Sequence, residues 1–167
     1  MIRMPTEPWL SGALTDVDPY LAPVLYSFEM ARQDLAVCTE GLTAAQIWAR
    51  PGGAASIGFH IRHIGGSTDR LLTYAERRQL DASQMAEAQA EAREGASREE
   101  LLVELGSRLA AAETRVRALD PERFREARSV GRKQLPTTLI GLVVHIAEHT
   151  QRHTGQAVTT AKFVRAQ

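Results

Sequence analysis

Apolar residues recur at helical spacing in four separate stretches of this sequence, and this feature limits the possible folds more than any other. Residues three and four apart lie on the same side of an α-helix, so each stretch would present one apolar stripe. No stretch of convincing length alternates as a half-buried strand does, apart from a short extended piece near Ser129. The pattern predicts an all-α fold, a four-helix bundle in which the stripes share one core.

Capping residues indicate where the helices begin and end. We expect Asp18 to cap the first helix and Gly41 to end it, and Ser56 to cap the second. Ser97 and Glu100 have the spacing of a capping box at the start of the third. The expected long helices cover residues 18–40, 56–78 and 97–119, and a short helical piece is expected at 43–48. Pro136-Thr137-Thr138 leads into a fourth long helix that reaches about residue 163.

Two connections differ in composition from the helices. Residues 81–96 are rich in Ala, Glu and Gln, and we expect a crossover loop there with some helical content. Residues 123–133 are basic and poor in large apolar residues, which indicates a surface connection with a turn at Gly131. A length of 167 residues fits one domain, so we assign residues 1–167 to a single unit.

Charge and cysteine content narrow the classes of partner. The 20 basic and 20 acidic residues balance, which argues against a protein that coats nucleic acid or a membrane. The single cysteine, Cys38, excludes an intramolecular disulfide, and the N-terminus lacks the apolar core of a signal peptide. We expect a cytoplasmic protein that acts on a small-molecule substrate.

All five histidines lie in two of the expected helices. His145, His149 and His153 are spaced four apart, so they form one row on the last helix, while His60 and His63 lie on the second. Two imidazoles at this spacing can converge on one ion, and a third from a facing helix would leave coordination positions open. Such an arrangement is typical of a catalytic zinc or nickel centre.

Spacing alone does not select the ligands. His60 and His63 are about 300° apart around their helix, so we expect only one of them to be a ligand. His145 could be a ligand, a hydrogen-bonding partner of a ligand, or a residue lining the helix interface. Glu148 and Asp69 are weak candidates for a general base, because helical geometry turns each of them away from the nearest histidine of the expected site. Glu148 also fits a solvated or salt-bridged surface position.

A basic run in the second connection has two competing interpretations. It consists of Arg123, Arg125, Arg128, Arg132 and Lys133. The run could recognise substrate carboxylates, or it could be a solvated loop. The two tryptophans, Trp9 and Trp48, are interpreted as packing anchors.

The segment His-Ile-Ala-Glu-His-Thr-Gln-Arg-His-Thr-Gly-Gln at 145–156 resembles the signature of the DinB-like superfamily, which includes the YfiT-like metal-dependent hydrolases. Ser-Ile-Gly-Phe-His-Ile-Arg-His-Ile at 56–64 resembles that superfamily's second-helix motif. Thr-Glu-Pro-Trp at 6–9 resembles an N-terminal motif of some members. The resemblance spans nearly the whole chain.

This resemblance implies a four-helix bundle with up-down-down-up connectivity, usually dimeric, that holds a divalent metal in a histidine triad. Carried over residue by residue, the triad falls on His63, His149 and His153, and Gly155-Gln156 matches the trailing Gly-Gln. Nickel or zinc is favoured, with manganese or iron as alternatives.

Two classes of function follow from such a site. In the first, the protein is a metal-dependent enzyme, either a hydrolase or a transferase that uses a low-molecular-weight thiol such as mycothiol or bacillithiol. The metal would lower the pKa of water, polarise a carbonyl or hold a thiolate. In the second, the protein is a non-catalytic stress-response or interaction bundle, and a structural metal joins two helices. A metal site closed to solvent would exclude the enzymatic interpretation.

Overall fold

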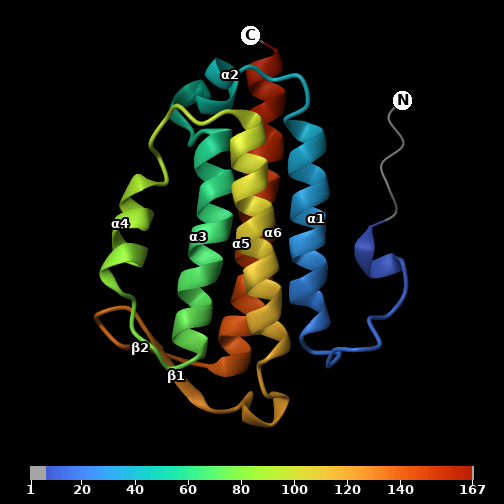
Figure 1. Cartoon of the computed structure of the whole chain (residues 1–167), viewed down its shortest axis with the longest axis vertical. Coiled ribbons are helices and arrows are strands. Elements are labelled where there is room, and N and C mark those ends of the chain that lie inside the picture. Colours follow the sequence, from blue (N-terminus) through green and yellow to red (C-terminus); the bar gives the residue numbers. More distant parts are fainter. Residues whose placement is uncertain (1–6, 167) are drawn as a thin grey trace.

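Four long helices lie side by side in the computed structural model, which describes residues 7–166 (Figure 1). α3 packs against α5 and α6, and α1 packs against the same two helices from the other side. The mostly helical fold predicted from the apolar stripes is thus confirmed. The four helices are α1 (Ala22–Cys38), α3 (Ile57–Ala75), α5 (Arg98–Arg117) and α6 (Leu139–Arg165).

The core lies between these helices and is built from the predicted apolar stripes. Its largest members are wholly buried, so water is excluded from the space between the helix axes. Burial of such side chains is the main favourable term in folding. They include Phe28, Leu35, Ile61, Ile64, Leu105 and Leu109.

Side-chain caps begin two of the helices as predicted. Ser56 accepts a hydrogen bond from the Phe59 amide at the start of α3. Ser97 and Glu100 form the full capping box of α5. The start of α1 was wrongly placed at Asp18, because that carboxylate accepts a hydrogen bond from the Tyr20 amide in a turn that precedes the helix.

Short helices occupy two of the connections. The predicted piece at 43–48 is α2 (Ala44–Trp48), capped by a Thr43–Gln46 box. The Ala/Glu/Gln-rich crossover contains α4 (Ala82–Ala90), which Asp81 caps and which has no buried residue. Single 3-10 turns are found at η1 (Pro8–Leu10), η2 (Pro51–Gly53) and η3 (Pro121–Arg123).

A small hairpin precedes the last helix. β1 (Ala127–Val130) pairs antiparallel with β2 (Leu135–Thr138), and Gly131 begins the turn with a positive φ of 70°. The extended piece predicted near Ser129 is confirmed. Pro136 and its neighbours pair with β1 and the Thr138 hydroxyl caps α6, so the last helix follows Pro136-Thr137-Thr138 as predicted.

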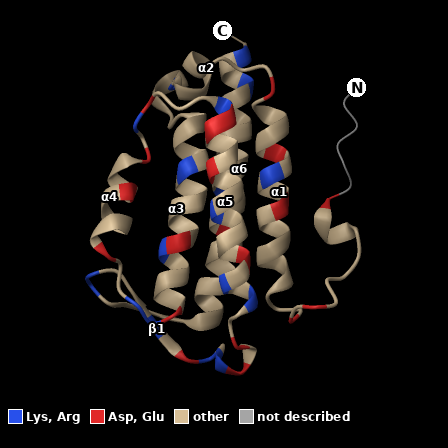
Figure 2. Ribbon diagram, viewed as in Figure 1, with Lys and Arg blue, Asp and Glu red and all other residues tan. Residues whose placement is uncertain are grey.

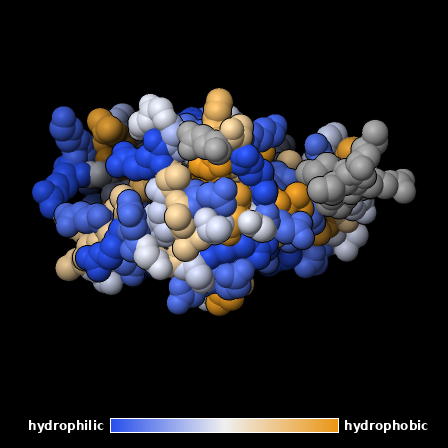
Figure 3. Space-filling model, turned by 90° about the horizontal axis from the view of Figure 1, so that it is seen from above, coloured by the Kyte–Doolittle hydropathy of each residue, from blue (hydrophilic) through white to orange (hydrophobic). Residues whose placement is uncertain are grey.

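Charges of both signs are interspersed along the four long helices (Figure 2). Seen from the end at which α2 lies, apolar residues form small separate areas among polar ones (Figure 3). Among the described residues, no helix is long and apolar enough to cross a membrane. Thr6 and the first residues of the chain, on which the N-terminal motif and the signal-peptide expectation partly fall, lie outside the described residues.

Candidate metal centre

Three histidines from two helices meet between α3 and α6. One nitrogen each of His63, His149 and His153 lies within 4.8 Å of the other two. The ring centroid of His63 is 4.4 Å from that of His153 and 5.0 Å from that of His149. The helical spacing of four brings the His149 and His153 rings to 4.5 Å. The arrangement is compatible with a metal site.

The donor set fits a divalent cation. Nδ1 of His149 is buried and has no hydrogen-bond partner among the described residues, and such an atom is costly unless something binds it. Burial lowers the pKa of His149 to about 4 and that of His153 to about 3, with the neighbouring histidines adding to both shifts. Both imidazoles are therefore neutral near pH 7, the form that binds metal.

His63 is held on two sides by residues outside the triad. Its ring stacks on Phe59, with centroids 5.1 Å apart. Its Nδ1 is 2.7 Å from Oε2 of Glu91, whose other oxygen accepts a hydrogen bond of 2.7 Å from Arg70. Burial alone would raise the pKa of Glu91, but the hydrogen bonds from His63 and Arg70 and the charge of Arg70 outweigh it and lower that pKa. Glu91 is thus a buried carboxylate.

The two remaining histidines occupy different positions. His60 is buried, and its Nδ1 is 2.9 Å from Nδ1 of His153, so it lies against the His153 side of the triad. His145 is 42% exposed and its Nδ1 is 3.0 Å from Oε2 of Glu148. Neither residue belongs to the group whose ligand atoms converge.

Without metal, the protein should lose stability as the pH falls from 7 to 5. Burial and the charge of His63 lower the pKa of His60 to about 4, below the ordinary 6.5 of an unfolded chain. The unfolded state therefore takes up protons first, and the stability present above pH 6.5 is lost as the pH falls towards 4. His60 alone would account for about 2 kcal/mol at pH 5.

Urea unfolding of chelator-treated protein at the two pH values measures this loss. His60→Gln carries no titrating ring, so its stability should depend less steeply on pH than that of the wild type. His145→Gln, on the exposed row position, is the matched control and should keep the wild-type slope. Equal slopes for all three proteins would contradict the prediction.

The two carboxylates considered as general bases lie in ion pairs. Glu148 is about half exposed and contacts Arg152 as well as His145. Asp69 is paired with Arg115 at 2.5 Å and faces α5. Their interpretation as salt-bridged carboxylates agrees with these contacts, and neither lies among the converging histidines.

The basic run lies on and beside the β1–β2 hairpin, where blue residues gather in Figure 2. Its interpretation as a solvated loop is wrong for Arg128, which is buried and donates to the Ala75 carbonyl at 2.7 Å. Arg123 and Arg128 both pair with Glu126. These two arginines therefore hold the hairpin and are not free to bind a substrate carboxylate.

A groove runs along α6 beside the triad. It has a volume of about 710 Å³, its lining is more apolar than polar, and His60 forms part of its wall. His60 touches His153, so the His60 side chain lies between the groove and the triad, and the three triad histidines are not among the residues that line the groove. Its other lining residues include Ala55, Arg152, Gln156, Thr159 and Phe163.

Sequence reasoning did not identify Glu91 and Arg70 as neighbours of the triad. Glu91 follows α4 in the segment interpreted as a crossover loop, 28 residues after His63. No spacing rule connects the two positions. The only signal in the sequence is an acidic residue at the end of a capped helix, which occurs on many surfaces.

Comparison with known proteins adds one finding. A family model described as the DinB superfamily matches residues 27–157, which include both histidine windows. A comparison with curated proteins gives no significant match. The family match confirms the resemblance inferred from the two histidine segments.

Proposed function

The chain belongs to the DinB superfamily, and we propose that it binds one divalent metal ion through His63, His149 and His153 and uses it on a small-molecule substrate. One observation carries the proposal: the three histidines offer nitrogens within 4.8 Å of one another. Three protein ligands leave coordination positions for water or substrate, whereas structural zinc sites usually have four. Nickel or zinc is the favoured ion, with manganese or iron as alternatives.

When bound, such an ion supplies Lewis-acid chemistry, which activates water or a thiol or polarises a carbonyl. The chain's own residues hold neutral imidazoles in place and shield one side of them with Phe59 and His60. No described carboxylate lies free beside the triad to serve as a general base. The proton released from water or a thiol would therefore have to go to solvent or to the substrate.

Two reactions fit this chemistry. One is transfer to a low-molecular-weight thiol, and the other is hydrolysis by water. The apolar groove beside His60 supports a substrate with an apolar body, but it favours neither reaction.

The alternative is a non-catalytic interaction protein in which the metal joins α3 to α6. This role predicts a site sealed from solvent by side chains. The three histidines are only partly buried, which favours the enzyme.

Other parts of the proposal concern the assembly. The up-down-down-up connectivity of the superfamily is supported by the long crossover that carries α4 between α3 and α5. We also propose a homodimer, a cytoplasmic location and no nucleic-acid or membrane partner. The even mixture of charges supports the last point.

Elemental analysis of protein purified without a polyhistidine tag tests metal binding. We expect about one divalent ion per chain, retained through gel filtration. Protein that holds no ion, even after incubation with nickel, zinc, manganese or iron salts, would refute the proposal.

Titration of the metal-loaded protein with mycothiol and bacillithiol then separates the reactions. Thiol binding that disappears when the metal is removed supports the transferase. If neither thiol binds, hydrolysis or the structural role remains, and the transferase is excluded for these two thiols.

A further inference from the structure

Glu91 is a buried acid whose two oxygens are both engaged. Oε2 is 2.7 Å from Nδ1 of His63, and Oε1 accepts a hydrogen bond of 2.7 Å from Arg70. Glu91 is only 6% exposed. Burying a carboxylate is unfavourable unless charge and hydrogen bonds compensate it, and Arg70 provides the charge. Because Arg70 compensates the buried charge, the Glu91 carboxylate can remain ionised in contact with His63.

A glycine on α3 makes room for this carboxylate. A Cβ added at Gly66 would lie 2.4 Å from Oε1 of Glu91 and 2.9 Å from Nη1 of Arg70. Glycine destabilises a helix interior relative to alanine. Gly66 is thus a position where the approach of Glu91 to α3 requires the absence of a side chain.

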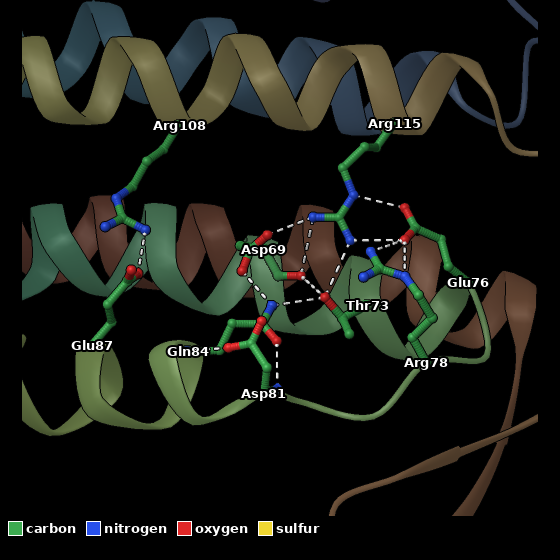
Figure 4. A network of polar contacts seen from close by, with 9 residues as sticks. All are labelled: Asp69, Thr73, Glu76, Arg78, Asp81, Gln84, Glu87, Arg108 and Arg115. Carbon is green, nitrogen blue, oxygen red and sulfur yellow. Dashed lines mark hydrogen bonds and ion pairs between the residues drawn. The ribbon is translucent and has the colours of Figure 1, made fainter.

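Polar contacts hold α4, the helix that directly precedes Glu91 (Figure 4). Nε2 of Gln84 lies 2.8 Å from Oγ1 of Thr73, and it also contacts Asp69, so α4 is tied to α3. Arg108 of α5 donates to Glu87 at 2.9 Å. α4 buries no residue of its own, so these polar contacts fix its position. They thereby also fix the position of Glu91, the residue that follows α4.

We propose that Glu91 is a positioning residue for the metal centre, acting through His63. The carboxylate accepts a hydrogen bond from Nδ1–H of His63, which keeps the proton on Nδ1 and leaves Nε2 as the unprotonated nitrogen available to a cation. Carboxylates in this role fix the tautomer and orientation of a ligating histidine and increase its basicity. The part of this proposal that concerns metal affinity rests on the proposed function, but the tautomer of His63 does not.

Zinc affinity is the first measurement, made by competition with a chromogenic chelator using zinc chloride. We expect Glu91→Ala to weaken zinc binding about 10- to 100-fold. Glu91→Gln keeps an oxygen that can accept the hydrogen bond and should recover part of the loss. Glu99→Gln removes a carboxylate of α5 that is 74% exposed and pairs with Arg98, not with a histidine or with α4, so it should bind zinc as the wild type does.

Gly66→Ala displaces the carboxylate without altering any ligand, so it should also weaken zinc binding. Gly106→Ala is its control, because a Cβ at that helical position meets nothing within 4 Å. Thermal unfolding of each metal-free variant shows whether it is folded. Folded Glu91→Ala and Gly66→Ala proteins that bind zinc like the wild type would overturn the proposal.

Histidine ¹⁵N NMR of the metal-free protein is the second measurement. We expect the proton of neutral His63 to reside on Nδ1 in the wild type and to shift towards Nε2 in Glu91→Ala. An unchanged tautomer in that variant would contradict the positioning role. If the wild type binds neither zinc nor nickel, manganese or iron, the proposed function fails, while the NMR comparison still decides the role of Glu91.

Discussion

His149→Ala should lose the metal while keeping the fold. Removing one of three ligands leaves two nitrogens, and we expect metal affinity to fall by more than about 100-fold, since even an outer hydrogen-bond partner contributes 10- to 100-fold. Nδ1 of His149 is buried with no hydrogen-bond partner among the described residues, so its removal also eliminates an unsatisfied polar atom in the metal-free protein. The metal-free stability should therefore change by only about 1 kcal/mol.

Elemental analysis and urea unfolding measure these two effects separately. His145→Ala is the matched control, because His145 lies one helical turn earlier on the same row and contacts Glu148. It should retain the metal at the wild-type ratio. Equal metal content in His149→Ala and the wild type would show that the triad is wrongly assigned.

Trp48→Ala should be the most destabilising of the substitutions considered. The ring is buried, its Nε1 donates to the Ala96 carbonyl at 2.9 Å, and the Arg62 guanidinium lies 5.2 Å from its centroid. At Gly58 a Cβ would come within 2.7 Å of the ring, so the indole lies directly against the start of α3. Loss of such a side chain costs about 3–5 kcal/mol.

Two comparison variants separate packing from hydrogen bonding. Trp48→Phe keeps much of the ring and loses the donor to Ala96, so we expect a smaller loss of about 1–2 kcal/mol. Trp9→Ala should change stability by less than about 0.5 kcal/mol, because Trp9 is 54% exposed. Denaturant unfolding followed by circular dichroism measures all three. A Trp48→Ala protein as stable as Trp9→Ala would contradict the prediction.

The exposure of Trp9 also corrects its interpretation as a packing anchor, which holds for Trp48 alone. Local caps explain why most of the fold could be predicted: Ser56 and Ser97 bond to amides three residues away, so the sequence contains the whole interaction. β2 could not be predicted, since it is only four residues long, contains Pro136 and depends on pairing with β1.

The site was predictable to the extent that it depends on one helix. Helical geometry places His145, His149 and His153 in one row, but spacing put these three equally in contention and left His60 and His63 unresolved. The resemblance to a family selected His63, His149 and His153, and the structure brings these three together. The contact of Glu91 with His63 depends on how a crossover folds back, which no local pattern records.

The placement of two histidines on one helix and the third on another has a consequence for metal choice. The backbone of α6 fixes the separation of His149 and His153, so only the distance and tilt between α3 and α6 can adjust the third ligand. Buried residues such as Ile64 and Ile146 belong to the core that sets this distance. The buried side chains that separate the two helices would then determine which ionic radius the site prefers, although these side chains do not touch the ion.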